Sequence, residues 1–263
     1  MKVDKDRIVF LGTGGGQNVM FTQARKTGGI YIKMDGTEFI IDPGPGSLVY
    51  AQQLKLKPEK WDGILLSHLH PDHCTDANAL IDGIKNPILI AEEHCLVPSD
   101  DYYPCVSNYH QKKAKTYKAV DGSEFKIKPL NIKATKADHY APPVGFRIEG
   151  TKTICYAGDG TYYKGQEKNY DGCDILILNV LVPKGKIALL RKHMSVDEAI
   201  KLINRIEKKP KLVIIQHFSF WMLRSGLQLQ IKAIRDATGV KAIAAKDFME
   251  VELDTLKTRE LKA

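Results

Sequence analysis

The stretch Ser67-His68-Leu69-His70-Pro71-Asp72-His73 concentrates three histidines and one aspartate within six residues. It continues the apolar segment 63–67, whose composition predicts a buried strand. Side chains two positions apart in an extended strand point to the same side, so His68 and His70 can converge on one ion. The stretch therefore predicts a metal site at the end of a strand.

The second half of this stretch leaves the strand. Pro71 ends the extended conformation, so Asp72 and His73 can turn toward a second ion. Imidazole and carboxylate groups suit zinc, and they also suit iron or manganese. Four such groups packed this tightly would be costly to bury without a metal, which argues against ordinary core histidines.

Further ligand types stand where other predicted strands end. They are found in Asp138-His139, Gly158-Asp159-Gly160 and Gln216-His217-Phe218-Ser219. The carboxyl ends of strands are the usual location of sites in layered α/β folds. Each segment alone could be unrelated to metal binding, but together with residues 68–73 they complete the coordination of two ions.

The composition is that of a folded chain. Its 263 residues are 43% hydrophobic and 27% charged, which excludes a disordered chain and a disulfide-stapled mini-protein. The net charge of +8 allows an anionic ligand, although the excess is mostly lysine and specific nucleic-acid recognition relies more on arginine. The longest apolar stretch, 175–182, is too short to span a membrane, and the N-terminus lacks the apolar core of a signal peptide. Because the five cysteines are scattered, we expect a reduced, cytoplasmic compartment.

The order of elements predicts one domain spanning residues 1–263. Predicted strands come in two batches, each followed by helices, which suggests two β layers with helices outside. The strands are expected at 8–11, 30–33, 38–41, 63–67, 88–91, 124–129, 132–137, 144–149, 153–157, 175–179, 212–216 and 242–244, and the helices at 48–56, 76–84, 195–208 and 228–238. Ser195 and Glu198 have the spacing of a capping box. The polar segment 98–118 has no assignment, and the oligomeric state stays open, a homodimer included.

The pattern His68-x-His70-x-Asp72-His73, followed by His139, Asp159 and His217, resembles the metallo-β-lactamase superfamily. The order and spacing fit from Leu11-Gly12-Thr13-Gly14 to about residue 250. The resemblance implies an α/β (α+β) fold, a four-layered αβ/βα sandwich with a dinuclear site at the edges of its sheets. By position, it implies one ion held by His68, His70 and His139, a second held by Asp72, His73 and His217, and Asp159 bridging both.

The implied cofactor is a pair of divalent ions, for which we expect Zn²⁺, with Mn²⁺ or Fe²⁺ as alternatives. Two ions roughly 3.5–4 Å apart can hold a bridging hydroxide and bind a substrate oxygen. Among the ligands, Asp72 is the one whose loss we expect to abolish turnover. Asp42, in Ile41-Asp42-Pro43-Gly44, matches the acidic residue of the superfamily's first motif, and it is expected to organise the ligands rather than bind an ion.

Two details favour a hydrolytic branch of the superfamily. His70 stands where a redox di-iron branch carries glutamate. The segments His193-Met194-Ser195 and His217-Phe218-Ser219 resemble ribonuclease Z and its relatives, and this resemblance makes His193 the candidate general acid. The alternative is a surface histidine that precedes a helix cap.

The glycine run Leu11-Gly12-Thr13-Gly14-Gly15-Gly16 also resembles that group. We expect it to form a tight turn at the rim of the site, and Gly14 and Gly15 are candidate substrate contacts. The chain departs from ribonuclease Z in two respects. It continues with Phe220-Trp221-Met222 where that enzyme has Arg-Tyr, and the long basic arm that grips transfer RNA has no counterpart. The match is closer to arm-less metal-dependent hydrolases and to relatives acting on small cyclic phosphodiesters.

Other substrate contacts are suggested by residue type alone. Basic side chains that could bind phosphate are Lys184, Lys186, Arg191, Lys192 and Arg224. Aromatic side chains that could form a lid or stack on a base are Tyr102, Tyr103 and Tyr109. For each of them, packing or plain solvation is an equal alternative.

Three functions are compatible with the sequence. The leading hypothesis is a metal-dependent phosphodiesterase acting on a small cyclic phosphodiester or on RNA. The second keeps the ions and changes the bond, as in a thioester or lactam hydrolase of the glyoxalase II or β-lactamase type. The third, a non-catalytic metal-binding scaffold, predicts missing ligands, and none of the seven expected positions is missing.

Overall fold

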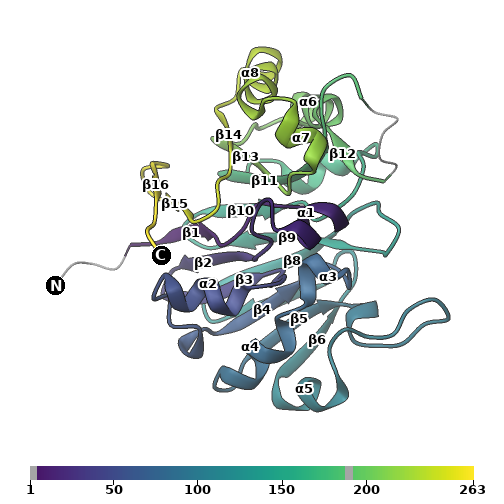
Figure 1. The fold of residues 1–263 in the computed structure, drawn as a ribbon, viewed down its shortest axis with the longest axis vertical. Coiled ribbons are helices and arrows are strands. Elements are labelled where there is room, and N and C mark those ends of the chain that lie inside the picture. The colour runs from purple at the N-terminus through teal and green to yellow at the C-terminus, as the bar shows by residue number, and fades with distance from the viewer. Residues whose placement is uncertain (1–4, 187–191) are drawn as a thin grey trace.

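The computed structural model describes residues 5–186 and 192–263, and two mixed sheets form its centre (Figure 1). The first sheet has the strand order β16-β15-β1-β2-β3-β4-β5-β6. Its strands are β1 (Arg7–Phe10), β2 (Ile30–Met34), β3 (Thr37–Ile41), β4 (Gly63–Leu66), β5 (Ile88–Glu92), β6 (Lys115–Ala119), β15 (Met249–Glu252) and β16 (Thr258–Glu260). From β3 to β6 the neighbours are parallel, so these strands end at the same edge.

The second sheet has the order β14-β13-β11-β10-β9-β8-β7, and β12 pairs with β11 beyond this path. Its strands are β7 (Glu124–Ile127), β8 (Leu130–Lys136), β9 (Val144–Glu149), β10 (Thr153–Tyr156), β11 (Ile175–Val182), β12 (Met194–Ser195), β13 (Leu212–Gln216) and β14 (Ala242–Ala244). Strands β10, β11, β13 and β14 are parallel. Every residue of β11 is buried, as expected for a parallel strand covered on both faces.

Helices flank the two sheets, most of them on the outer faces (Figure 1). They are α1 (Gln17–Thr22), α2 (Ser47–Gln53), α3 (Pro71–Cys74), α4 (Ala77–Gly83), α5 (Asn108–Lys113), α6 (Val196–Arg205), α7 (Phe220–Arg224) and α8 (Leu227–Thr238). Helices α1 and α3 lie at the edge where the strands end. Short 3₁₀ turns span Pro58–Lys60, Glu93–Cys95 and Gln166–Tyr170. Figure 1 places α2, α4 and α5 in the lower half and α6, α7 and α8 in the upper half.

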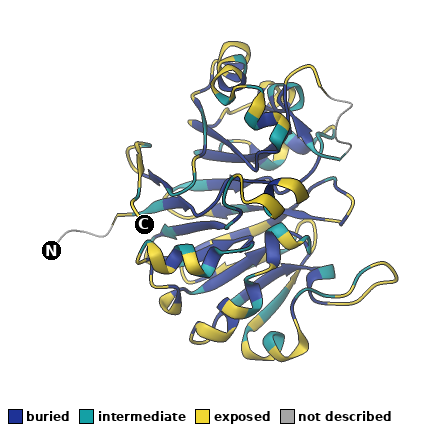
Figure 2. Cartoon of the chain, in the orientation of Figure 1, coloured by how far each residue is buried: buried dark blue, intermediate teal, exposed yellow. Residues whose placement is uncertain are grey.

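Three apolar layers hold these elements together, and strands are mostly buried while helices expose one face (Figure 2). The central layer lies between the two sheets and includes Phe39 and Phe146. A second layer packs the first sheet against its helices around Trp61, and a third packs the second sheet against α6 and α8 around Leu202. This arrangement confirms the predicted αβ/βα sandwich.

Most predicted elements are present with shifted ends, and the capping box of α6 is confirmed. The Ser195 hydroxyl accepts the N–H of Glu198 at 3.2 Å, and the Glu198 carboxylate accepts the N–H of Ser195 at 2.8 Å. The unassigned segment 98–118 contains α5 and all of β6 except its last residue. Strand β6 escapes prediction because it is an edge strand with exposed lysines in place of an alternating apolar face.

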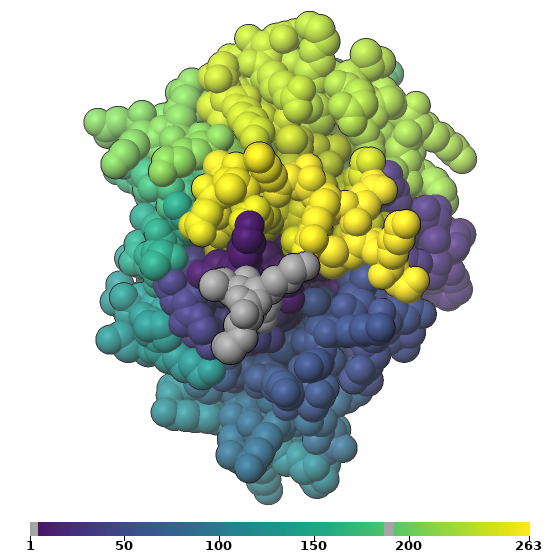
Figure 3. All heavy atoms as spheres, turned by 90° about the vertical axis from the view of Figure 1, so that its left-hand side faces the viewer, coloured from purple at the N-terminus to yellow at the C-terminus, as the bar shows by residue number. Residues whose placement is uncertain are grey.

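The last two strands of the chain, β15 and β16, extend the first sheet beyond β1, and the sequence analysis did not predict them. Strand β15 pairs antiparallel with β1, and β16 forms the exposed edge. Figure 3 shows these C-terminal residues beside the N-terminal segment, between the two halves of the molecule. None of the helices within residues 5–186 and 192–263 has the length and apolar composition needed to span a membrane.

The central layer gives a direct test of the fold. Phe146→Ala should lower the free energy of unfolding by about 3–5 kcal/mol, because Phe146 is fully buried between the sheets and its removal leaves a cavity. Urea denaturation followed by circular dichroism measures the change. Tyr103→Ala is the control, since that side chain is 91% exposed. Equal stability of the two variants would contradict the packing described.

Candidate metal centre

Three of the predicted ligands meet at the carboxyl edge of the sheets. The Nε2 atom of His68 lies 3.0 Å from Nδ1 of His70, and Nε2 of His139 lies 3.3 Å from the same atom. His68 and His70 follow β4, and His139 follows β8 from the other sheet. The structure thus brings together the first predicted triad.

Hydrogen bonds on the far side of these rings fix where their protons lie. The Nδ1 atom of His139 faces the carbonyl oxygen of Lys192 at 2.8 Å, and a carbonyl can only accept. The Ser67 hydroxyl donates to Asp42 at 2.6 Å, so it can only accept from Nδ1 of His68 at 3.0 Å. Both rings therefore carry their proton on Nδ1 and direct the lone pair of Nε2 inward, as metal ligands do.

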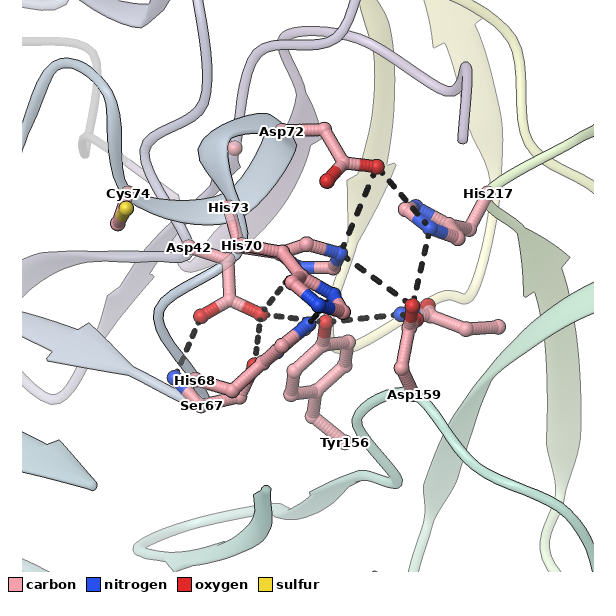
Figure 4. A network of polar contacts seen from close by, with 12 residues as sticks. Asp42, Ser67, His68, His70, Asp72, His73, Cys74, Tyr156, Asp159 and His217 are labelled. Atoms are coloured by element: carbon pink, nitrogen blue, oxygen red, sulfur yellow. Dashed lines mark hydrogen bonds and ion pairs between the residues drawn. The ribbon is translucent and has the colours of Figure 1, made fainter. Parts of the chain in front are cut away.

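The second predicted triad forms beside the first (Figure 4). The Nε2 atoms of His73 and His217 lie 3.9 and 3.6 Å from a carboxylate oxygen of Asp72. The same two atoms lie 3.5 and 3.3 Å from Asp159. Both are buried and have no hydrogen-bond partner among the described residues. Buried polar atoms left unpaired are costly, and a cation between them and the carboxylates would satisfy all four groups.

The charge states at this cluster also fit a metal. Burial raises the pKa of Asp159, but His217 and His73 outweigh it and hold that pKa well below its usual range. Burial and the neighbouring His73 hold the pKa of His68 well below its usual range. Against the effect of burial, Asp159 and Asp72 raise the pKa of His73 well above its usual value, so a proton and a metal compete for this ring. Ionised carboxylates and neutral imidazoles are the states that divalent ions need.

Asp42 lies behind the ligands and accepts four hydrogen bonds. One of its oxygens accepts the N–H of Ser67 at 2.6 Å. The other accepts the hydroxyls of Ser67 and Tyr156, each at 2.6 Å, and Nδ1 of His73 at 3.0 Å. Asp42 is close enough to His68 and His73 to share an ion with them. Because its inner oxygen already has three donors, we interpret it as the residue that orients these rings.

Three residues of the cluster were missed by sequence reasoning. The Asn179 amide donates to Asp159 at 2.7 Å and to the Tyr156 hydroxyl at 3.0 Å. The Gln216 amide donates to the side-chain oxygen of Asn179 at 2.6 Å. The signal that could have found Asn179 is its position as the one polar residue in the apolar run 175–182, since a buried amide needs partners.

The glycine-rich loop supports the ligands directly. The N–H of Gly16 donates to Asp72 at 3.0 Å. A Cβ on Gly15 would overlap the ring of His217, so only glycine fits there. Gly14 forms a bridge with Phe218 and packs against Val19. The loop therefore contacts the histidine–aspartate cluster directly, and Gly15 also lines the neighbouring hollow.

A hollow of about 300 Å³ lies beside the cluster, and His193 stands at their boundary. The residues that line it are Gly15, Gly16, Gln17, Asn18, Val19, Leu181, His193, Ser219, Phe220 and Trp221. The Nδ1 atom of His193 is 3.7 Å from Asp159 and has no hydrogen-bond partner among the described residues. Burial lowers the pKa of His193 to about 4, so its ring is neutral at pH 7. His193 also lies within ligand distance of an ion shared with His139 and Asp159.

Comparison with known proteins agrees with this geometry. The model of the β-lactamase superfamily domain matches residues 37–218, more than half of the chain. The chain belongs to the β-lactamase superfamily. An uncharacterized protein of Methanocaldococcus jannaschii is 32% identical over 255 residues, which are 94% of each chain. The solved metallo-β-lactamase fold protein YhfI from Bacillus subtilis has a TM-score of 0.75 at 17% identity, covering 94% of this chain and 99% of that one.

Two further relatives carry names of an activity. A metal-dependent hydrolase of Thermoplasma acidophilum is 28% identical over 211 residues, 76% of this chain and 85% of that protein. A ribonuclease Z of Kineococcus radiotolerans is 24% identical over 155 residues, 54% of this chain and 47% of that protein. The predicted superfamily, fold and enzyme class are thereby confirmed.

The basic and aromatic residues that the sequence suggested as substrate contacts lie outside the cluster where the structure describes them. Arg224 is exposed, its guanidinium 5.5 Å from the centre of the Phe220 ring, and it does not line the hollow. Lys184 and Lys186 are exposed, Lys192 pairs with Asp138, and Arg191 lies outside the described residues. Tyr109 and Tyr103 are exposed, and the Tyr102 hydroxyl donates to the carbonyl of Tyr140 at 3.4 Å.

Asp42 provides a test of how the superfamily scaffold orients these ligands. Asp42→Asn should weaken metal binding about 10- to 100-fold, because an amide cannot accept all the donors that meet its carboxylate. Metal content after dialysis against a graded chelator measures the change. The control is Asp62→Asn, because Asp62 precedes β4 at the opposite end and accepts the N–H of Glu38 at 2.9 Å. Full metal retention in Asp42→Asn would show that Asp42 does not orient the ligands.

Proposed function

We propose that this metal-dependent hydrolase cleaves phosphodiester bonds, in a small cyclic phosphodiester or in RNA. The observation that carries the proposal is the position of His193 between the histidine–aspartate cluster and the hollow. A phosphodiester bound at the cluster would place one of its two ester oxygens, with the group attached to it, beside the ring of His193. The ribonuclease Z relative and the net charge of +8 support an anionic substrate.

In this proposal two divalent ions are held by the ligand sets predicted from the sequence. His68, His70 and His139 would hold one, Asp72, His73 and His217 would hold the other, and Asp159 would bridge them. Such ions, expected to be zinc, supply hydroxide near neutral pH and offset charge on the phosphate. The protein fixes the ligands through Asp42, Asn179 and the N–H of Gly16.

His193 would donate the proton that the leaving oxygen needs. Burial keeps the ring neutral, as its lowered pKa shows, and an anionic phosphate beside it would stabilise the protonated form. The Nδ1 atom faces Asp159 at 3.7 Å, and the ring also borders the hollow where the leaving group would lie. Transfer of a proton by a positioned side chain typically contributes about 10²–10⁴-fold in rate.

The reaction itself is tested with bis(p-nitrophenyl) phosphate. Asp72→Asn should lose nearly all turnover and bind the second ion weakly, because it removes a negative ligand that faces His73 and His217. Release of p-nitrophenol with added zinc or manganese, and metal content per chain, are the two measurements. Its matched control is Asp82→Asn, whose carboxylate pairs with Lys113 on the surface. Wild-type activity in Asp72→Asn would remove Asp72 from the ligand set.

An inactive wild-type protein would decide against the proposed bond. If about two ions bind per chain and no phosphodiester is cleaved, acyl thioester and lactam substrates become the next test of the same centre. Turnover of those substrates alone would replace the phosphodiesterase proposal by the alternative function.

The role of His193 is tested by the leaving group. His193→Ala should lower kcat by about 10²-fold or more for a phosphodiester with an alcohol leaving group. The loss should be much smaller for a p-nitrophenyl ester, whose leaving group needs little protonation. His193→Gln keeps about the same side-chain size. It should show the same difference in kcat loss between the two leaving groups, with unchanged metal content. Loss of metal in both variants would instead identify His193 as a ligand.

A further inference from the structure

The hollow beside His193 has an aromatic wall with no role in holding the ions. Phe220 and Trp221 open helix α7, three and four residues after His217. Trp221 is 42% exposed, and none of the ring contacts among the described residues involves it. The other tryptophan, Trp61, is 2% exposed and packs against Tyr31 at 5.3 Å. A large apolar ring held open at a hollow is a feature of binding sites rather than of packing.

The chemistry of the lining specifies what would fit. Among the described residues, the lining contains no acidic side chain, lysine or arginine, and the ring of His193 is neutral, so the hollow suits an uncharged group. Gln17 and Asn18 stand exposed at its mouth, and their side-chain amides have no partner among the described residues. Amides beside an aromatic face can pair with the polar edge of a ring that stacks on that face. A volume of about 300 Å³ is at the lower end for small-molecule sites, which favours one ring system.

We infer that this hollow binds a planar, uncharged ring, a nucleobase or similar aryl group, carried by the leaving group of the substrate. The inference rests on the proposed phosphodiesterase activity and narrows its substrate class. The phosphate lies at the cluster, His193 faces the leaving oxygen, and the ring attached beyond that oxygen stacks on Trp221. Gln17 and Asn18 hydrogen-bond the edge of the ring.

The wall is linked to the ligands through a short connection. Ser219 caps α7 by accepting the N–H of Met222 at 3.2 Å, and its hydroxyl donates to the carbonyl of Leu181 at the end of β11. The backbone of His217 and the start of α7 are therefore joined by one capped turn. This short connection limits the distance between a phosphate at the cluster and a ring in the hollow.

Calorimetric titration of the metal-loaded protein with two matched probes tests the inference. Adenosine 5′-monophosphate carries a base, and ribose 5-phosphate lacks it. Wild-type protein should bind the nucleotide about 5- to 150-fold more tightly, the range expected for one stacked base. Trp221→Ala should lose this preference, Trp221→Phe should keep most of it, and Tyr109→Ala, an exposed ring on α5, should leave it unchanged.

Fluorescence locates the ring independently of activity. Because Trp61 is buried, quenching of tryptophan emission by the nucleotide but not by the sugar phosphate would report contact with Trp221. Equal affinity for both probes, or a preference that survives in Trp221→Ala, would overturn the inference. Tighter binding of octyl phosphate than of the nucleotide would assign the hollow to an alkyl chain and also overturn it.

The two proposals fail separately. Cleavage of bis(p-nitrophenyl) phosphate without any preference for the base would leave the phosphodiesterase and remove the ring site. A Trp221-dependent preference for the base in a protein that cleaves no phosphodiester would leave the ring site and remove the proposed reaction.

Discussion

The cluster depends on the burial of one carboxylate. A buried carboxyl group needs hydrogen-bond donors around it, and the side chain of Asp42 meets four of them. The donors come from the end of β4, from α3 and, through Tyr156, from β10 of the other sheet. Asp42 itself adopts a left-handed conformation with φ of 50°, which directs its side chain inward at some conformational cost. Asp42 therefore links the two sheets through Tyr156, contacts the ring of His73 directly and reaches the ring of His68 through the Ser67 hydroxyl.

The site residues that the sequence predicted either lie within one short segment or directly follow a predicted strand. His68 to His73 lie within one segment, and strand ends place Asp159 and His217 without knowledge of the pairing. The residues that it missed act across strands. Asn179 and Gln216 are register partners on β11 and β13, and their contact exists only once that pairing is known. The same reason applies to β15, whose place beside β1 depends on a pairing across most of the chain.

The glycine loop also has a structural role beside the cluster that the sequence did not reveal. The sequence predicts a tight turn at the rim of the site here, with Gly14 and Gly15 as candidate substrate contacts. In the structure, the missing side chain of Gly15 leaves room for the ring of His217, which occupies the space that a Cβ would take. His217 itself has a φ of 65°, so the loop and this ligand constrain each other. Phe220 and Trp221, where the sequence departs from ribonuclease Z, line the hollow, whose lining contains no lysine or arginine in the part of the chain that the structure describes.

The division of the cluster between two sheets has a consequence for how the protein matures. Asp42 and the residues from His68 to His73 are synthesised early, whereas His139, Asp159 and His217 belong to the later part of the chain. During translation, the emerging first half displays several imidazoles with half of their eventual neighbours absent. Part of the histidine–aspartate cluster is therefore absent from a nascent chain until residue 217 has left the ribosome, so the complete cluster forms only late in biogenesis.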